Sequence, residues 1–245
     1  MVVSLLKHPA PGWLAPGARI YAVGDVHGCA IRLDMLHALV AADLAARPAA
    51  APLLVHLGDF IDRGPDSAGV IARLADSAPL PGVPMVALRG NHEQMMVEAL
   101  DGLPGALDNW RDNGGDAALR SWGIKRPGKA KEWPASLPPA HVAFLRGLRL
   151  TYAVDGYLFV HAGVRPGVPL ADQVPDDLLW IRRAFLDWPG LLLPESPRCA
   201  VVHGHTPQPA PVVTANRIGV DTGAVRGGLL TCAVIEGTEV GFLSC

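Results

Sequence analysis

Several short segments of this sequence place acids and histidines beside glycines, and the first of them sets the pattern. Residues 24–28, GDVHG, directly follow the apolar run 20–23. Asp25 and His27 lie two residues apart, so in an extended chain their side chains point to the same side. A carboxylate and an imidazole aimed at one point are suitable ligands for a divalent first-row metal ion. Flanking glycines let the backbone bend sharply and approach a ligand closely.

Four later segments repeat this combination of a metal-type ligand and glycine. They are GDFIDRG (58–64), GNHE (90–93), HAG (161–163) and GHT (204–206). With the first segment they supply the candidate metal ligands Asp25, His27, Asp59, Asn91, His161 and His205. This set is too large for one tetrahedral zinc ion and suits two divalent ions that share a carboxylate. Asp59 is the natural shared ligand, and the neutral oxygen of Asn91 limits the negative charge.

The polar residues beside these ligands indicate what such a site could do. Two ions about 3.5–4 Å apart can clamp a phosphate and lower the pKa of a bridging water from about 15.7 towards 7. The guanidinium group of Arg63 can bind phosphate oxygens in a bidentate manner. His92 directly follows Asn91 and can protonate a leaving alkoxide. Asp62 can hydrogen-bond His92 and favour its charged form. The pattern predicts hydrolysis of phosphate esters, with a metal-bridging hydroxide as nucleophile and His92 as general acid.

The composition excludes several classes of function. The chain has 245 residues, half of them hydrophobic, which suffices for one large domain with its own core. Its formal net charge of −2 offers no field that would attract nucleic acid or an anionic membrane. No apolar run reaches the roughly 18 residues of a membrane span. The four cysteines lack the Cys-x-x-Cys spacing of a zinc ribbon. We therefore expect one cytoplasmic domain over residues 1–245, without nucleic-acid or membrane partners.

The hydrophobic pattern predicts an α/β fold. The expected strands of the first hundred residues are 20–23, 53–57 and 85–88, and the expected helices are 29–46, 67–75 and 93–100. Each strand ends in a polar cluster, and sites in α/β sheets lie at the carboxyl ends of strands. The last hundred residues are rich in expected strands: 157–160, 200–202, 218–220, 229–235 and 240–243. Gly227-Gly228 and Glu236-Gly237 are typical of hairpin turns.

The remaining segments have weaker patterns. Residues 1–18 are rich in proline and glycine and are expected to form an irregular leader. Residues 108–122 favour one or two helices broken at Gly114-Gly115, and 141–148 favours another helix. The basic segment 121–137 is either a flap that contacts an acidic substrate or a solvated loop. The tryptophans fit packing better than a platform for stacking bases.

The ordered series of glycine-flanked segments, from about residue 20 to 235, resembles the calcineurin-like metallophosphoesterases. It is most similar to bacterial phosphoprotein phosphatases, which act on phosphoserine and phosphothreonine. The resemblance implies a four-layered α-β-β-α sandwich forming a single metallophosphoesterase domain. It also implies two divalent ions, with manganese favoured over iron or zinc. It implies that one ion is held by Asp25, His27 and Asp59, and the other by Asp59, Asn91, His161 and His205. It further implies that Arg63 and Asn91 bind phosphate and that His92 and Asp62 form the acid pair.

The resemblance leaves two assignments open. A second phosphate-binding arginine of the family corresponds to the LWIRR segment, 179–183, where Arg182 is favoured over Arg183. The tail, 219–232, is similar to that of symmetrical diadenosine tetraphosphate hydrolases. Those relatives generally lack the acid at the position of Asp62 and carry Asp where Glu93 stands.

Three functions follow in order of preference. The first is a serine/threonine protein phosphatase or a phosphatase of small phosphoesters, and the second is a dinucleoside polyphosphate hydrolase. The third, a non-catalytic binding protein, does not explain Asp62, Arg63 and His92. His203 could point the same way as His205 along a strand, but the resemblance assigns it no ligand role. The sequence does not indicate the oligomeric state.

Overall fold

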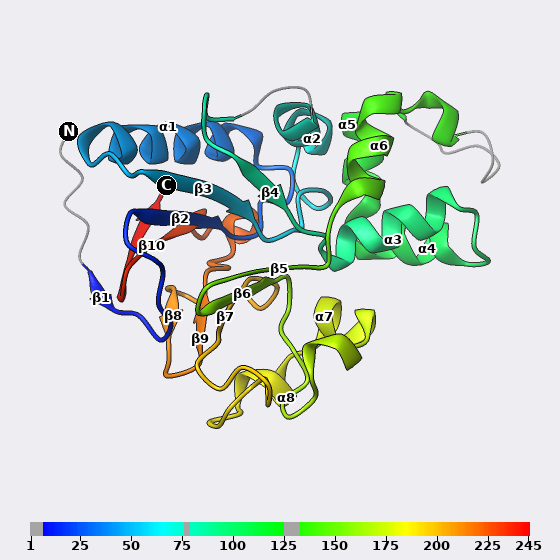
Figure 1. Ribbon diagram of the computed structural model, residues 1–245. Helices are drawn as coiled ribbons and strands as arrows, with labels where there is room; N and C mark the ends of the chain where they lie inside the picture. Colours follow the sequence, from blue (N-terminus) through cyan, green and yellow to red (C-terminus); the bar gives the residue numbers. More distant parts are fainter. Residues whose placement is uncertain (1–6, 76–78, 125–132) are drawn as a thin grey trace.

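The computed structural model describes residues 7–75, 79–124 and 133–245, which fold around two sheets (Figure 1). The first sheet has the strand order β1-β11-β10-β2-β3-β4. Its strands are β1 (His8–Pro9), β2 (Ala18–Val23), β3 (Ala51–His56), β4 (Met85–Ala87), β10 (Thr231–Glu236) and β11 (Glu239–Ser244). Because β2, β3 and β4 run parallel, their carboxyl ends meet at one edge of the sheet.

The second sheet has the order β5-β6-β7-β9-β8. Its strands are β5 (Thr151–Val154), β6 (Tyr157–Val160), β7 (Ala200–His203), β8 (Val212–Val213) and β9 (Arg217–Gly219). The three central strands β6, β7 and β9 are parallel. Their carboxyl ends therefore also lie on one edge, from which loops can reach the loops of the first sheet.

Helices cover the outer face of each sheet. The first sheet carries α1 (Ala30–Ala46), α2 (Ser67–Ala75), α3 (Asn91–Leu100), α4 (Ala106–Trp110), α5 (Asp116–Ser121) and α6 (Pro139–Gly147) on one side (Figure 1). The second sheet carries α7 (Pro175–Trp180) and α8 (Arg183–Leu186). Short helical turns complete the chain: the π-turn η1 (Arg111–Gly115) and the 3-10 turns η2 (Trp133–Ser136), η3 (Leu170–Asp172) and η4 (Ala224–Arg226).

Alternation along the strands explains the four layers. In β2, Tyr21 and Val23 pack against the outer helices, whereas Ile20 and Ala22 pack against the second sheet. Side chains alternate between the faces of a strand, so one strand serves two cores. On the far side of the second sheet, Val160 packs with the residues of α7 and α8. The predicted four-layered α-β-β-α sandwich is confirmed.

The elements predicted for the first hundred residues agree closely with the structure, and the differences lie in the rest of the chain and in the leader. The turn at Glu236-Gly237 joins β10 to β11, as predicted. The hairpin predicted at Gly227-Gly228 is wrong, because β9 and β10 belong to different sheets and the chain crosses between them through η4. Within the expected irregular leader, His8–Pro9 pairs with β11.

The central segment contains the predicted break. The helical run from α4 to α5 is interrupted at Gly114, whose φ of 107° is outside the helical range. Trp133 is buried and stacks on Trp110 with ring centroids 5.4 Å apart, so these two tryptophans pack in the core. Residues 125–132 of the proposed 121–137 flap lie outside the described residues. None of the described helices is long and apolar enough to cross a membrane.

Candidate active site

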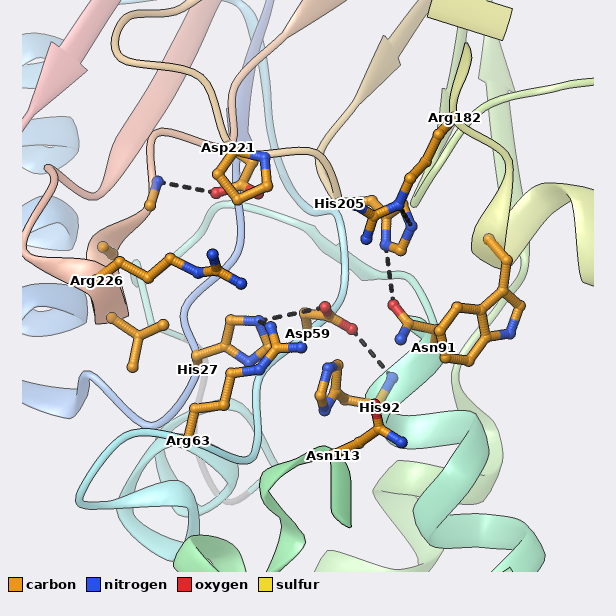
Figure 2. Close-up of a pocket in the computed structure, with 15 residues that line it drawn as sticks. His27, Asp59, Arg63, Asn91, His92, Asn113, Arg182, His205, Asp221 and Arg226 are labelled. Carbon is orange, nitrogen blue, oxygen red and sulfur yellow. Dashed lines mark hydrogen bonds and ion pairs between the residues drawn. The ribbon is translucent and has the colours of Figure 1, made fainter. Parts of the chain in front are cut away.

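Loops from both sheets bring four of the candidate metal ligands, His27, Asp59, Asn91 and His205, to one pocket (Figure 2). The other two lie beside it, His161 against Asn91 and Asp25 against the N–H of His205. Asp25 and His27 follow β2, Asp59 follows β3, Asn91 opens α3 after β4, His161 follows β6 and His205 follows β7. All these side chains are buried. Because each ligand stands just beyond the carboxyl end of a strand, the parallel strands of both sheets position the site.

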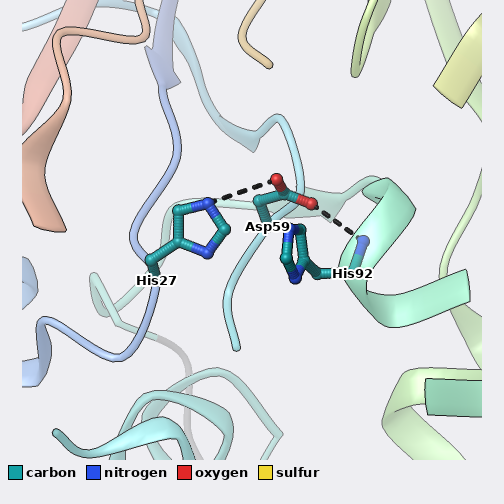
Figure 3. A group of neighbouring side chains, drawn as sticks. All are labelled: His27, Asp59 and His92. Carbon is teal, nitrogen blue, oxygen red and sulfur yellow. Dashed lines mark hydrogen bonds and ion pairs between the residues drawn. The ribbon is translucent and has the colours of Figure 1, made fainter. Parts of the chain in front are cut away.

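Asp59 lies between two groups of donor atoms. Its Oδ2 is 3.3 Å from His27 Nε2, and its Oδ1 is 3.4 Å from His161 Nε2. Figure 3 shows the carboxylate between His27 and the backbone N–H of His92, which donates to Oδ1 at 3.1 Å. The two oxygens of Asp59 therefore face different groups, as a carboxylate shared by two ions requires.

The second group forms around Asn91. Its Oδ1 is 2.9 Å from His161 Nε2 and 3.0 Å from His205 Nδ1. These side chains come from three different elements, α3 and the loops after β6 and β7. The convergence of an amide oxygen and two imidazole nitrogens on one point is the arrangement that a first-row divalent cation would bind.

The protonation of the histidines suits metal binding. Burial lowers the pKa of His27 and of His161 to about 3 and that of His205 to about 2, so the rings stay neutral. His27 Nδ1 donates to the carbonyl of Ile61 at 2.8 Å, and His161 Nδ1 donates to that of Leu57 at 2.9 Å. These hydrogen bonds fix the tautomers that leave Nε2 as a lone-pair donor.

Several carboxylates are buried at the same place. The backbone N–H of His205 donates to Asp25 at 3.1 Å, and Asp221 shares a side-chain hydrogen bond with Asp25. Burial, followed by repulsion from neighbouring acids, raises the pKa of Asp25 and of Asp59 well above the usual range. Uncompensated buried charge is costly, so divalent cations would stabilise this cluster. The donor set therefore fits the two ions that the sequence predicts.

The backbone around these ligands adopts uncommon conformations. φ is positive at His27 (43°), Asp59 (52°), Asp62 (72°), Arg63 (64°) and His205 (65°). Such left-handed conformations of residues other than glycine cluster at functional sites. Glycines allow close approach beside them: a Cβ at Gly90 would lie 2.1 Å from Asp59 Oδ1, and one at Gly204 would lie 2.1 Å from Asp25 Oδ1.

Glu93 holds the loop after β3 in place. Its carboxylate accepts hydrogen bonds from the backbone N–H groups of Asp59 at 2.8 Å, Phe60 at 2.7 Å and Gly90 at 2.8 Å. Glu93 is fully buried. It supports the metal-binding loop rather than facing the pocket, in agreement with the supporting role expected from the sequence.

The proposed acid pair is in contact. His92 Nδ1 lies 2.6 Å from Asp62 Oδ2, and Trp110 Nε1 donates to the same oxygen at 2.8 Å. In the described part of the chain, His92 Nε2 has no hydrogen-bond partner, and His92 lines the pocket. Burial lowers the pKa of His92 and raises that of Asp62. The pair can thus carry a proton at Nε2 only when negative charge in the pocket stabilises it.

The pocket contains one of the two arginines, Arg182 and Arg183, between which the sequence left phosphate binding open. Arg63 Nη1 donates to His27 Nε2 at 2.8 Å, and Arg182 Nε donates to His205 Nε2 at 3.2 Å. Both line the pocket, whereas Arg183 does not. The two guanidinium groups approach from opposite sides (Figure 2).

Some residues of the pocket were not predicted from the sequence. Asp221, Arg226, Asn113 and Trp180 also line it. Asp221 could have been found from the sequence, because like the other candidate ligands it is an acid in a glycine-rich turn after an apolar strand, here β9. No local pattern distinguished the other three.

His203 lies outside the groups of metal donors. Its ring packs edge-on against Phe185 with centroids 5.0 Å apart, and Nδ1 donates to the carbonyl of Gly204.

Comparison with known proteins agrees with this geometry. Residues 18–227 match the family model described as calcineurin-like phosphoesterase. The chain is 33% identical to serine/threonine-protein phosphatase 1 of Salmonella typhimurium over 89% of this chain and 92% of that protein. It is 32% identical to the symmetrical bis(5'-nucleosyl)-tetraphosphatase of Ralstonia nicotianae, over 60% of this chain and 42% of that protein.

Solved structures share the fold. A crystal structure of a protein provisionally named a diadenosine tetraphosphatase aligns with a TM-score of 0.60 at 22% identity, covering 95% of this chain and 98% of that one. A serine/threonine phosphatase from Saccharomyces cerevisiae aligns with a TM-score of 0.56 at 15% identity, covering 94% and 80%. With a family match over most of its length and a buried cluster of metal-type ligands, the chain belongs to the calcineurin-like phosphoesterases and is a hydrolase of phosphoesters.

Proposed function

We propose that this protein is a metal-dependent phosphatase that acts on phosphoserine and phosphothreonine side chains. The observation that carries the proposal is the 2.6 Å contact between His92 and Asp62. A phosphomonoester of serine or threonine leaves as a strongly basic alkoxide, which needs a proton from the enzyme. A nucleoside phosphate leaves as a weakly basic anion and needs this proton less. The similarity to the Salmonella serine/threonine-protein phosphatase supports the same choice.

In this proposal two divalent ions occupy the buried cluster. Asp25, His27 and Asp59 hold one ion, and Asp59, Asn91, His161 and His205 hold the other. When bound, the ions would polarise the phosphoryl oxygens and lower the pKa of a water molecule. Manganese suits this mixture of carboxylate, amide and imidazole donors, and iron and zinc accept the same ligands.

The remaining side chains act on the substrate. Arg63 and Arg182 bind the phosphoryl oxygens from opposite sides of the pocket, and the amide of Asn91 assists them. His92 Nε2 faces the pocket and gives a proton to the leaving oxygen, while Asp62 orients the ring through Nδ1. The dianionic substrate raises the pKa of His92 against the effect of burial, so the proton is present when it is needed.

A second candidate is the hydrolysis of dinucleoside polyphosphates. It is favoured by the similarity to the Ralstonia tetraphosphatase and by Trp180, which is 38% exposed and lines the pocket. An exposed indole can stack on a nucleobase.

A substrate panel on manganese-loaded protein tests the proposal. We expect kcat/KM to be higher for phosphoserine and phosphothreonine peptides than for diadenosine tetraphosphate. We expect Asp62→Asn to lower kcat more with the peptides than with p-nitrophenyl phosphate, whose leaving group needs no proton. Asp108→Asn, a change at an exposed acid, is the matched control. Turnover of the dinucleotide to ADP without turnover of peptides would establish the second candidate instead. No turnover with manganese, iron or zinc would contradict both.

A further inference from the structure

A third arginine, Arg226, lines the pocket without a role in the account above. It stands at the end of η4, and Figure 2 shows its guanidinium on the same side of the pocket as His27 and Arg63. Across the described residues, Arg226 has no hydrogen bond from its side chain and no ion pair within 4.0 Å. Arg63 and Arg182, by contrast, each donate to a histidine of the cluster.

The turn that carries Arg226 is closely hydrogen-bonded. The backbone N–H of Gly223 donates to Asp221 Oδ1 at 2.9 Å, and that of Arg226 donates to the carbonyl of Gly223 at 2.8 Å. Thr222 Oγ1 donates to the carbonyl of Leu229 at 2.6 Å. A Cβ at Gly228 would lie 1.9 Å from the carbonyl oxygen of Thr222, so the turn cannot relax around a larger residue. Arg226 is therefore presented to the pocket from a fixed backbone.

The charges in the pocket exceed what one phosphoryl group needs. In the proposed function, Arg63, Arg182 and the bound cations would already engage the oxygens of a single phosphate. Arg63 and Arg226 line the same pocket, and Figure 2 shows both on the side where His27 lies. Asp221 is the acid near Arg226, and it is engaged by Asp25 and the N–H of Gly223. Like charges on one side of a pocket repel each other, and a second anion would relieve that repulsion.

We propose that Arg226 binds a second phosphate of the substrate, next to the phosphate that is hydrolysed. The enzyme then prefers substrates that carry two neighbouring phosphate groups over those that carry one. This inference rests on the proposed function only in placing the first phosphate between Arg63 and Arg182. Two sources share the required chemistry: a polyphosphate chain, and a peptide with adjacent phosphorylated residues.

A pair of matched inhibitors tests the inference without turnover. Methylphosphonate carries one phosphonate, and methylenediphosphonate carries two on one carbon. Their dissociation constants are measured by calorimetry on metal-loaded protein at fixed free manganese. We expect Arg226→Gln to raise the dissociation constant of methylenediphosphonate about tenfold more than that of methylphosphonate. A loss of this size is typical of one charge-assisted hydrogen-bonding contact. Arg63→Gln should weaken both ligands. Arg120→Gln, at an exposed arginine of α5, should leave the ratio unchanged.

The inference would be overturned if the ratio of the dissociation constants of methylphosphonate and methylenediphosphonate were the same in Arg226→Gln and in the wild type. The thermal unfolding midpoint of the variant is measured alongside. Were Arg226→Gln to unfold at a lower temperature, Arg226→Lys, which keeps the charge on the same turn, should still bind methylenediphosphonate more tightly than Arg226→Met.

Turnover measurements with three substrates then identify the source of the second phosphate. The effect of Arg226→Gln on kcat/KM is compared for diadenosine tetraphosphate, for a peptide with two adjacent phosphoserines, and for the same peptide with one. A selective loss on the dinucleotide assigns the site to a polyphosphate chain, and a selective loss on the doubly phosphorylated peptide assigns it to a peptide. Equal losses on all three substrates would overturn the inference. Absent turnover of every peptide by the wild type would contradict the protein phosphatase proposal alone, because the binding ratio is measured independently.

Discussion

The two sides of the metal cluster are built differently. On the first-sheet side, His27, Asp59 and Asn91 lie on loops that follow the parallel strands β2, β3 and β4. These loops carry most of the positive φ values found at residues other than glycine, and Glu93 binds backbone N–H groups of the loops after β3 and β4. On the second-sheet side, His161 and His205 follow β6 and β7 with fewer supports of their own.

The second side depends on the first. His161 Nδ1 donates to the carbonyl of Leu57 at the end of β3, and the backbone N–H of His205 donates to Asp25. The N–H of Gly204 in turn donates to the carbonyl of His161. The loops of the first sheet therefore position ligands from both sheets. Changes on the first-sheet side should therefore disturb the whole cluster, and changes on the second-sheet side should act more locally.

Asp59→Asn should have the largest effect, because Asp59 faces both groups of donors. Replacing the shared carboxylate by an amide removes the charge that holds two cations close together. We expect turnover to fall by about 10³-fold or more, with loss of bound metal. Metal analysis of the purified variant, alongside steady-state rates, measures this. Two ions retained at a normal rate would show that Asp59 does not link the two sides.

His92→Asn should come next. The variant keeps a polar side chain of similar reach but cannot supply a proton from Nε2. We expect kcat on phosphoserine peptides to fall by about 10²–10³-fold, with a smaller loss on p-nitrophenyl phosphate. Metal content should remain that of the wild type, which separates this effect from that of Asp59→Asn. Equal losses on both substrates would argue against proton donation by His92.

Glu93→Gln tests the rigidity of the first-sheet side. One oxygen becomes an NH₂ group that cannot accept the backbone N–H bonds, and buried donors lose their partner. We expect the free energy of unfolding to fall by about 2 kcal/mol, measured by urea denaturation. Glu98→Gln on the same helix is the matched control, because among the described residues Glu98 accepts a hydrogen bond only from Gln94. Unfolding curves that coincide for both variants would show that Glu93 does not hold the loop.

Arg182→Gln should have the smallest effect and tests the second-sheet side. Loss of one arginine contact to the phosphoryl group should raise KM about tenfold, with metal content unchanged. Arg183→Gln, one residue farther and outside the pocket, should change KM by less than about twofold. The reverse result would assign phosphate binding to Arg183.

The difference between the two sides of the metal cluster also explains which parts of the molecule could be predicted from the sequence. The ligands on the first sheet were found because each follows a short apolar strand and is flanked by glycine, so the signal is local. Elements that depend on tertiary packing were harder to predict. The pairing of Gly227-Gly228 was misassigned, because which sheet a strand joins is decided by long-range contacts. The short strand β5 and helices α7 and α8 were not predicted.

The same reasoning explains what was missed in the pocket. Asn113 and Trp180 reach it through the broken helix and through α7, whose placement no local pattern encodes. Arg226 enters through the η4 turn between the two sheets, a segment that was predicted to be a hairpin. Interactions at a distance, such as the contact of Asp62 with His92, could be proposed from residue types and were found in the fold.

The most direct test of this account is a crystal structure of the protein soaked in manganese, with anomalous scattering used to locate the ions. The account predicts two ions on either side of the Asp59 carboxylate, one touching Asp25 and His27 and the other touching Asn91, His161 and His205. A single ion, or ions bound away from Asp59, would contradict it.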